Sequence, residues 1–178
     1  IQGIAIVAES YAAAPQASTK ALPSERPSRL SGAHLYDGKL MFHGPCFQGV
    51  TSIDRTSPNG VTGQLQTLPT QSLFSTIANP QFVTDPVVLD AAGQLIGFWA
   101  AEHLARGFVV FPYRLEKLHI YGPNRPAGER LQCRADLQLQ GSEGIRSDIE
   151  VTAADGSLWM RLEGWADRRF DPPQQFHR

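Results

Sequence analysis

Cysteine is scarce in this chain of 178 residues, which holds only Cys46 and Cys133, without Cys-x-x-Cys spacing. A disulfide framework or a zinc site is therefore not expected, and a reducing, cytoplasmic location is the simpler expectation. Neither sign of charge dominates, because 16 Lys and Arg face 17 Asp and Glu. This balance gives no electrostatic reason to expect nucleic acid or an anionic membrane as partner. No apolar run reaches the roughly 18–20 residues that cross a bilayer.

Hydrophobic residues make up 42% of the chain, which suits one globular domain with a core. Residues 11–31 are rich in Ala, Pro and Ser, a composition typical of a linker or an irregular surface segment. We therefore expect a linker over 1–33, a folded domain over 34–171 and an exit tail over 172–178. The chain does not begin with Met, which suggests a fragment of a longer protein.

One long helix is predicted from Val87 to Leu104. Asp85 is a good N-cap, Pro86 suits the first helical position, and Gly107 is a plausible stop. Apolar residues fall on nearly every face of this segment, which indicates a buried helix rather than one lying on a surface.

Strand patterns flank this helix. Segments 47–55 and 61–68 are joined by Asn59-Gly60, a strong hairpin signal. Four more strand-like segments follow the helix, at 108–121, 131–139, 145–151 and 157–170, and several alternate in polarity as half-buried strands do. The predicted class is α+β, an antiparallel sheet wrapped around a central buried helix, which is the hotdog fold.

Asp90 is the most informative candidate for chemistry. It lies on the helix expected to be buried, five residues after the cap, so it is not needed for capping. A carboxylate there has to be desolvated, paired or protonated, which marks a possible catalytic acid. Gln94 lies one turn further on the same face, where its amide can hold that carboxyl group. The alternative is an ordinary acid in the first turns, favoured by the helix dipole.

Several other residues admit two interpretations. Gly93 and Gly97 leave room for close backbone approach or for a substrate chain. His43 is either a switchable acid or base, or a turn histidine that only packs. Gly44-Pro45 forms a turn that delivers Phe47 into the next strand. Two further expectations are that the three tryptophans belong to the core and that Asp167, Arg168 and Arg169 form a solvated strand end.

Three motifs resemble one family in the same order. Leu40 to Gly49 resembles the Phe-His-Gly-Pro-x-Phe-Gln signature of polyketide synthase dehydratase domains. Pro86 to Gln94 is similar to their Pro-x-Leu-Asp-x-x-x-Gln motif. Segments 158–161 and 164–170 resemble the end of dehydratases from iterative synthases, of the enediyne and polyunsaturated-acid types especially. The resemblance covers roughly 34–170 and is to the second, aspartate-bearing hotdog of a tandem pair.

The resemblance implies an enzyme that removes water from 3-hydroxyacyl chains carried on the phosphopantetheine arm of acyl carrier protein. Asp90 is then the general acid and Gln94 its holder, while His43, Gly44, Pro45 and Phe47 support Asp90 or bind substrate. The family's base is a histidine in a His-x-x-x-Gly-x-x-x-x-Pro motif of the first hotdog. No histidine of this chain fits that motif, so we expect a preceding hotdog half to supply it. No cofactor or metal is implied.

Two other functions stay open. The chain could be a non-catalytic hotdog that binds or shapes acyl intermediates within a synthase. It could also be a homodimeric hotdog thioesterase in which Asp90 orients water. No glycine-rich phosphate loop, serine nucleophile elbow or metal-ligand cluster is present to favour another chemistry.

Overall fold

The computed structural model describes residues 3–30, 35–37, 40–104 and 109–170. Within them, a single antiparallel sheet packs against one long helix, α1 (Pro86–His103). The strands in chain order are β1 (Arg26–Pro27), β2 (Val50–Ser57), β3 (Gly60–Gln66), β4 (Val109–Arg114), β5 (Lys117–Ile120), β6 (Arg130–Gln140), β7 (Gly144–Thr152) and β8 (Leu158–Phe170). They are ordered β1-β2-β3-β6-β7-β8-β4 across the sheet, and β5 also pairs with β8.

Helix α1 begins where its sequence signals predicted. The Asp85 side chain accepts hydrogen bonds from the backbone N–H groups of Val87 (2.8 Å) and Val88 (3.1 Å), while Pro86 opens the first turn. The last turn closes with a hydrogen bond from Leu104 N to Ala100 O. The predicted stop at residue 107 lies outside the described residues. No helix in the described part of the chain is long and apolar enough to span a membrane.

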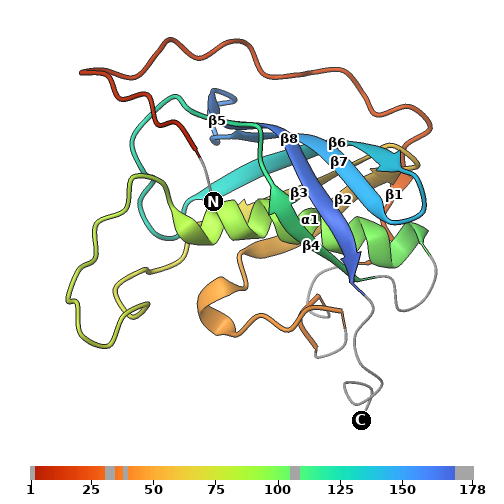
Figure 1. The fold of residues 1–178 in the computed structure, drawn as a ribbon, viewed down its shortest axis with the longest axis horizontal. Helices are drawn as coiled ribbons and strands as arrows, with labels where there is room; N and C mark the ends of the chain where they lie inside the picture. Colours follow the sequence, from red (N-terminus) through yellow and green to blue (C-terminus); the bar gives the residue numbers. More distant parts are fainter. Residues whose placement is uncertain (1–2, 31–34, 38–39, 105–108, 171–178) are drawn as a thin grey trace.

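The helix lies across one face of the sheet (Figure 1), and its apolar residues are buried there. Trp99, Trp159 and Trp165 belong to this core, as predicted. Trp99 donates from Nε1 to the Ser57 carbonyl, so the one polar atom of its buried ring is satisfied. The predicted hotdog arrangement, a sheet around a central buried helix, is therefore confirmed.

Two strand predictions need correction. The first strand was expected from Phe47, but Pro45–Phe47 forms a short 3₁₀ helix, η2, and β2 starts at Val50. The segment 108–121 was expected to be one strand, yet it forms β4 and β5, which pair with successive parts of β8. Gly164 lies between those parts with φ +64°, a conformation open to glycine, and this bend separates the two pairings.

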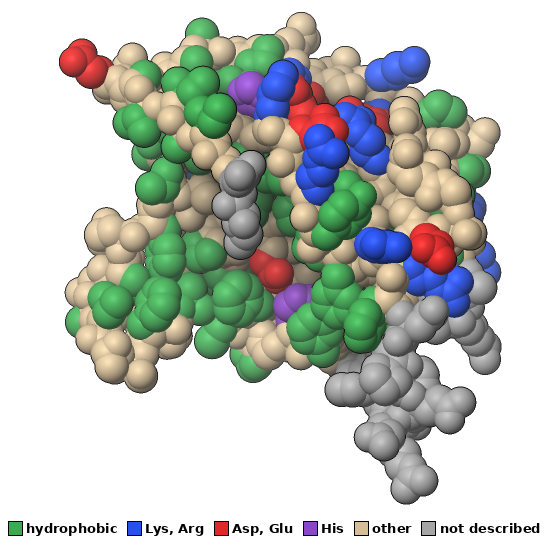
Figure 2. Space-filling model, viewed as in Figure 1, with side chains coloured by type: hydrophobic (Ala, Val, Ile, Leu, Met, Phe, Trp, Pro, Cys, Tyr) green, Lys and Arg blue, Asp and Glu red, His purple; other side chains and the backbone are tan. Residues whose placement is uncertain are grey.

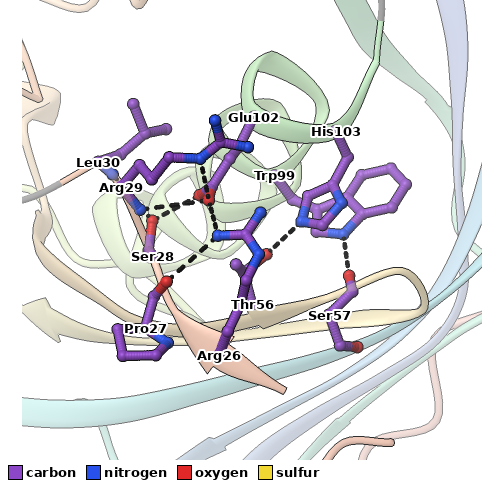
Figure 3. A network of polar contacts seen from close by, with 10 residues as sticks. All are labelled: Arg26, Pro27, Ser28, Arg29, Leu30, Thr56, Ser57, Trp99, Glu102 and His103. Atoms are coloured by element: carbon purple, nitrogen blue, oxygen red, sulfur yellow. Dashed lines mark hydrogen bonds and ion pairs between the residues drawn. The ribbon is translucent and has the colours of Figure 1, made fainter. Parts of the chain in front are cut away.

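The end of α1 is tied to the segment around β1 (Figure 3). The Glu102 side chain is 3% exposed and accepts hydrogen bonds from Arg26, from Ser28 Oγ (2.6 Å) and from Arg29 N (3.2 Å). Burial alone would raise the pKa of this carboxyl, but the hydrogen bonds from Ser28 and Arg26 hold it below its ordinary value. The neighbouring His103 lies 2.7 Å from Thr56 Oγ1. These contacts anchor residues 26–29 to the fold.

Asp167 contradicts the prediction of a solvated strand end. Asp167 is buried, with 2% of its surface exposed, whereas the Arg168 side chain is 71% exposed. Burial raises the pKa of Asp167 to about 7, and the neighbouring Trp165 side chain opposes this only in part. Among the described residues, Asp167 Oδ2 has no hydrogen-bond partner. The sequence pattern of β8 therefore did not indicate that Asp167 is buried.

Candidate active site

Asp90, Gln94 and His43 meet where η2 packs against the first turns of α1. The helix supplies Asp90 and Gln94 at i and i+4, which places both side chains on one face. His43 comes from the turn that precedes η2, where the hydrogen bond from Phe47 N to Gly44 O (2.9 Å) closes the chain on itself. The Gln48 side chain also donates to the His43 carbonyl at 3.0 Å. Local turn chemistry thus places His43 opposite the helix.

One oxygen of Asp90 takes both contacts. Gln94 Nε2 donates to Asp90 Oδ2 at 2.6 Å, and His43 Nε2 lies 3.3 Å from the same oxygen. Among the described residues, no group donates to Oδ1. The Asp90 side chain is 38% exposed, so of the three states expected for it, desolvated, paired or protonated, the structure shows a paired carboxyl group. The carboxyl group is paired and open to the surface, as a group that meets a substrate must be.

Gln94 is held on three sides. Its Nε2 also donates to the Phe47 carbonyl at 2.7 Å, and its Oε1 accepts from the Tyr36 hydroxyl at 2.6 Å. The Tyr36 oxygen in turn accepts from the backbone N–H of Val50 at 2.9 Å. Phe47 therefore joins the site through its backbone carbonyl. No sequence pattern pointed to Tyr36, because it lies in a segment without periodicity, 58 residues before its partner.

His43 lies on an aromatic surface. Its ring stacks on Phe42 with centroids 4.4 Å apart, and Phe42 continues to Phe111 and then to Phe170 at 5.9 and 5.5 Å. Phe42 is 75% exposed. Figure 2 shows an acidic and a histidine side chain next to each other in a hollow of this face, flanked by hydrophobic side chains. The polar pair is therefore bordered by apolar surface that an aliphatic chain can contact.

The two helix glycines serve packing. A Cβ on Gly93 would lie 2.7 Å from Trp165 Cζ2, and a Cβ on Gly97 would lie 2.6 Å from Met41 Cε. Trp165 and Met41 thus fill the space beside these two glycines. This agrees with the interpretation of close approach rather than with room for a substrate chain. Gly44 differs, because nothing lies within 4 Å of a Cβ placed there. Gly44 and Pro45 shape the turn that carries His43.

The remaining histidines in the described residues lie elsewhere. His103 lies beside Thr56 at the other end of α1, and His119 lies 3.6 Å from Glu163 on the strands. No three His, Cys, Asp or Glu side chains of the described residues come close enough to hold a metal ion. Two cavities of about 460 and 400 Å³ are lined by neither Asp90 nor His43. The site offers one acid, one histidine and one fixed amide donor.

Comparison with known proteins gives a family match over nearly the whole chain. Residues 14–175 match the family described as polyketide synthase dehydratase N-terminal domain. The chain is 28% identical over 170 residues to one of the subunits of the polyunsaturated fatty acid synthase of Thraustochytrium sp.. That alignment covers 84% of this chain and 6% of the relative, so the chain spans a small part of that protein.

Solved structures show the same fold. The dehydratase domain of PpsC from Mycobacterium tuberculosis, in complex with C12:1-CoA, aligns with a TM-score of 0.64 at 24% identity. The alignment covers 89% of this chain and 56% of that one. The dehydratase domain of the CurJ module of curacin polyketide synthase aligns with a TM-score of 0.63 at 18% identity, covering 80% and 49%. The chain thus spans about half of each solved domain.

Proposed function

We propose, because this chain belongs to the polyketide synthase dehydratase family, that it is the aspartate-bearing half of a two-hotdog dehydratase. The proposed substrate is a 3-hydroxyacyl thioester on the phosphopantetheine arm of acyl carrier protein, and the product is the α,β-unsaturated thioester. The family description names an N-terminal domain, whereas the Asp90 and Gln94 motif favours the second hotdog. The assignment to the second half rests on that motif.

The observation that carries the proposal is the Asp90 carboxyl group, held at one oxygen and open at the other. Gln94 Nε2 and His43 Nε2 both contact Oδ2, which leaves Oδ1 available to hydrogen-bond a substrate hydroxyl. Protonated at Oδ1, Asp90 gives its proton to the departing β-hydroxyl, which leaves as water. The C–O bond breaks while a base takes the α-proton, and that electron pair forms the double bond.

We assign the base to a residue outside the described part of the chain. His43 lies beside Asp90, but it stacks on Phe42 and its Nδ1 is buried without a hydrogen-bond partner in the described part of the chain. We therefore assign His43 to orienting Asp90 or supporting the thioester. A second hotdog then supplies the histidine that removes the α-proton. A dry space between the two halves would allow the pKa values of acid and base to differ as elimination requires.

Three observations support an acyl thioester as substrate. The apolar surface of Phe42, Phe111 and Phe170 borders the acid and can hold an aliphatic chain. One relative belongs to a polyunsaturated fatty acid synthase, and one solved structure of the same fold holds C12:1-CoA.

The test is a dehydration assay with a 3-hydroxyacyl carrier-protein substrate, read by mass spectrometry. The chain alone is compared with the chain joined to a histidine-bearing hotdog, and with the joined protein carrying Asp90→Asn. Loss of one water only in the joined wild type is the expected result. A folded joined protein that loses no water would overturn the dehydratase proposal and leave a non-catalytic acyl-binding hotdog. Release of free acid by the chain alone would instead indicate a thioesterase.

A further inference from the structure

We infer that Tyr36 is a positioning residue of this site, acting through Gln94 to hold a donor against Asp90. The inference rests on the proposed function, because it assigns the residue a part in dehydration. The Tyr36 hydroxyl lies 2.6 Å from Gln94 Oε1, and Gln94 Nε2 lies 2.6 Å from Asp90 Oδ2. A single side-chain amide thus separates the phenol from the carboxyl group.

Backbone groups determine the direction of every hydrogen bond in this chain of contacts. The Val50 N–H can only donate, so the Tyr36 oxygen accepts from it at 2.9 Å. The one hydroxyl proton of Tyr36 is then left for Gln94 Oε1. At the other end of the amide, the Phe47 carbonyl can only accept, so Nε2 faces it at 2.7 Å. Both ends require the same amide orientation, with an N–H directed at Asp90.

The surroundings keep Tyr36 in place and protonated. Its neighbour Leu35 is 3% exposed, and its ring meets Phe98 edge to face with centroids 5.9 Å apart. Burial raises the pKa of Tyr36 to about 12, with the negative charge of Asp90 adding to the effect. The hydroxyl therefore stays a donor at any pH at which the enzyme is assayed.

Removing this hydroxyl takes a donor from Gln94 Oε1 and an acceptor from the backbone N–H of Val50. Gln94 is 4% exposed, so its Oε1 would lose the Tyr36 donor in surroundings with little water to replace it. Without the hydrogen bond from Tyr36, the Gln94 amide can rotate. Its Nε2, which donates to Asp90 Oδ2, then moves away from that oxygen. Misplacement of a catalytic group by about 1 Å costs on the order of a hundredfold in rate, so kcat should fall when the Tyr36 hydroxyl is removed.

The experiment is Tyr36→Phe in the full protein that joins this chain to the histidine-bearing hotdog. The ring and its contact with Phe98 stay, and only the hydroxyl is lost. We expect kcat to fall about tenfold to a hundredfold while KM changes less than about twofold. The matched control is Tyr113→Phe, because Tyr113 is 68% exposed and lies outside the cluster, and its kcat should stay unchanged.

A double-mutant cycle separates positioning from a general loss of stability. If Tyr36 acts through Gln94, Tyr36→Phe added to Gln94→Ala lowers kcat no further. Additive losses in the two backgrounds would overturn the inference. So would an unchanged kcat for Tyr36→Phe in an active wild-type enzyme, whereas an inactive wild type would count against the proposed function.

Crystal structures of the wild-type and Tyr36→Phe proteins test the geometry whether or not the assay detects turnover. We expect the Gln94 amide to rotate or become disordered in the variant, so that the Asp90 Oδ2 contact is lost. A Gln94 side chain that keeps its contacts with Phe47 and Asp90 unchanged would overturn the inference.

Discussion

Gln94 Nε2 lies 2.6 Å from Asp90 Oδ2, one helical turn further along the same face of α1. This contact gives one carboxylate oxygen a fixed amide donor and leaves the other oxygen for a substrate. His43 approaches the same held oxygen from a different part of the chain, at 3.3 Å. The site therefore combines one relationship set by helix periodicity with another set by tertiary packing.

Asp90→Asn should slow dehydration strongly without unfolding the protein. The amide keeps the size of the side chain but has no acidic proton to give, so the rate should fall by about 10² to 10⁴. The measurement is turnover of a 3-hydroxyacyl carrier-protein substrate by the joined protein. Asp136→Asn is the control, since Asp136 lies on β6 with its side chain 51% exposed. Equal rates for wild type and Asp90→Asn would exclude Asp90 as the acid.

Gln94→Leu should lower both stability and activity. The substitution keeps most of the volume but leaves the Phe47 carbonyl and the Tyr36 hydroxyl without their partner, at a cost of about 1–3 kcal/mol in the free energy of unfolding. Urea denaturation measures this cost, and the dehydration assay measures the loss of the donor on Asp90. A variant as stable as wild type would show that these hydrogen bonds are replaced by others.

Gly93→Ala tests whether Gly93 is needed for packing against Trp165 or to leave room for a substrate chain. The new methyl group would meet Trp165 Cζ2 at 2.7 Å, so we expect a loss of about 1–3 kcal/mol in unfolding free energy. Gly44→Ala is the matched control, because its φ of −71° suits alanine and nothing lies within 4 Å. If Gly93→Ala kept full stability and lost only activity, Gly93 would be making room for substrate instead.

Asp167 should make the protein less stable as pH rises from about 4 to about 7. Its pKa is about 7 in the folded protein against an ordinary value of 3.8. Over that range the unfolded chain releases this proton while the folded protein keeps it, so unfolding becomes easier; above about pH 7 the effect levels off. The contribution of Asp167 should be roughly 2–3 kcal/mol greater at pH 5 than at pH 8.

The check is chemical denaturation of wild type and Asp167→Asn at both pH values. The variant cannot titrate at this position, so its stability should fall less from pH 5 to pH 8. Asp136→Asn should keep the wild-type dependence, since that residue is largely exposed. Identical pH dependences for wild type and Asp167→Asn would show that Asp167 ionises normally in the folded protein.

Features that depend on neighbouring residues could be predicted from the amino-acid sequence. Asp85 and Pro86 predicted the start of α1, and Asn59-Gly60 predicted the β2–β3 hairpin, because capping and turn formation involve only a few consecutive residues. Helical spacing likewise predicted that Gln94 can reach Asp90, and the order of three motifs indicated the family.

Features that depend on residues far apart in the chain were set by tertiary packing. Tyr36 reaches Gln94 across 58 residues, and no periodic pattern connects them. Asp167 is buried on β8 only three residues after the positive-φ Gly164, and the sequence pattern alone did not indicate that burial. The Asp90 side chain is 38% exposed although apolar residues fall on nearly every face of its helix, since the exposure of a side chain depends on what packs against it. Burial is a property of the assembled core, whereas caps, turns and helical spacing are properties of the local chain.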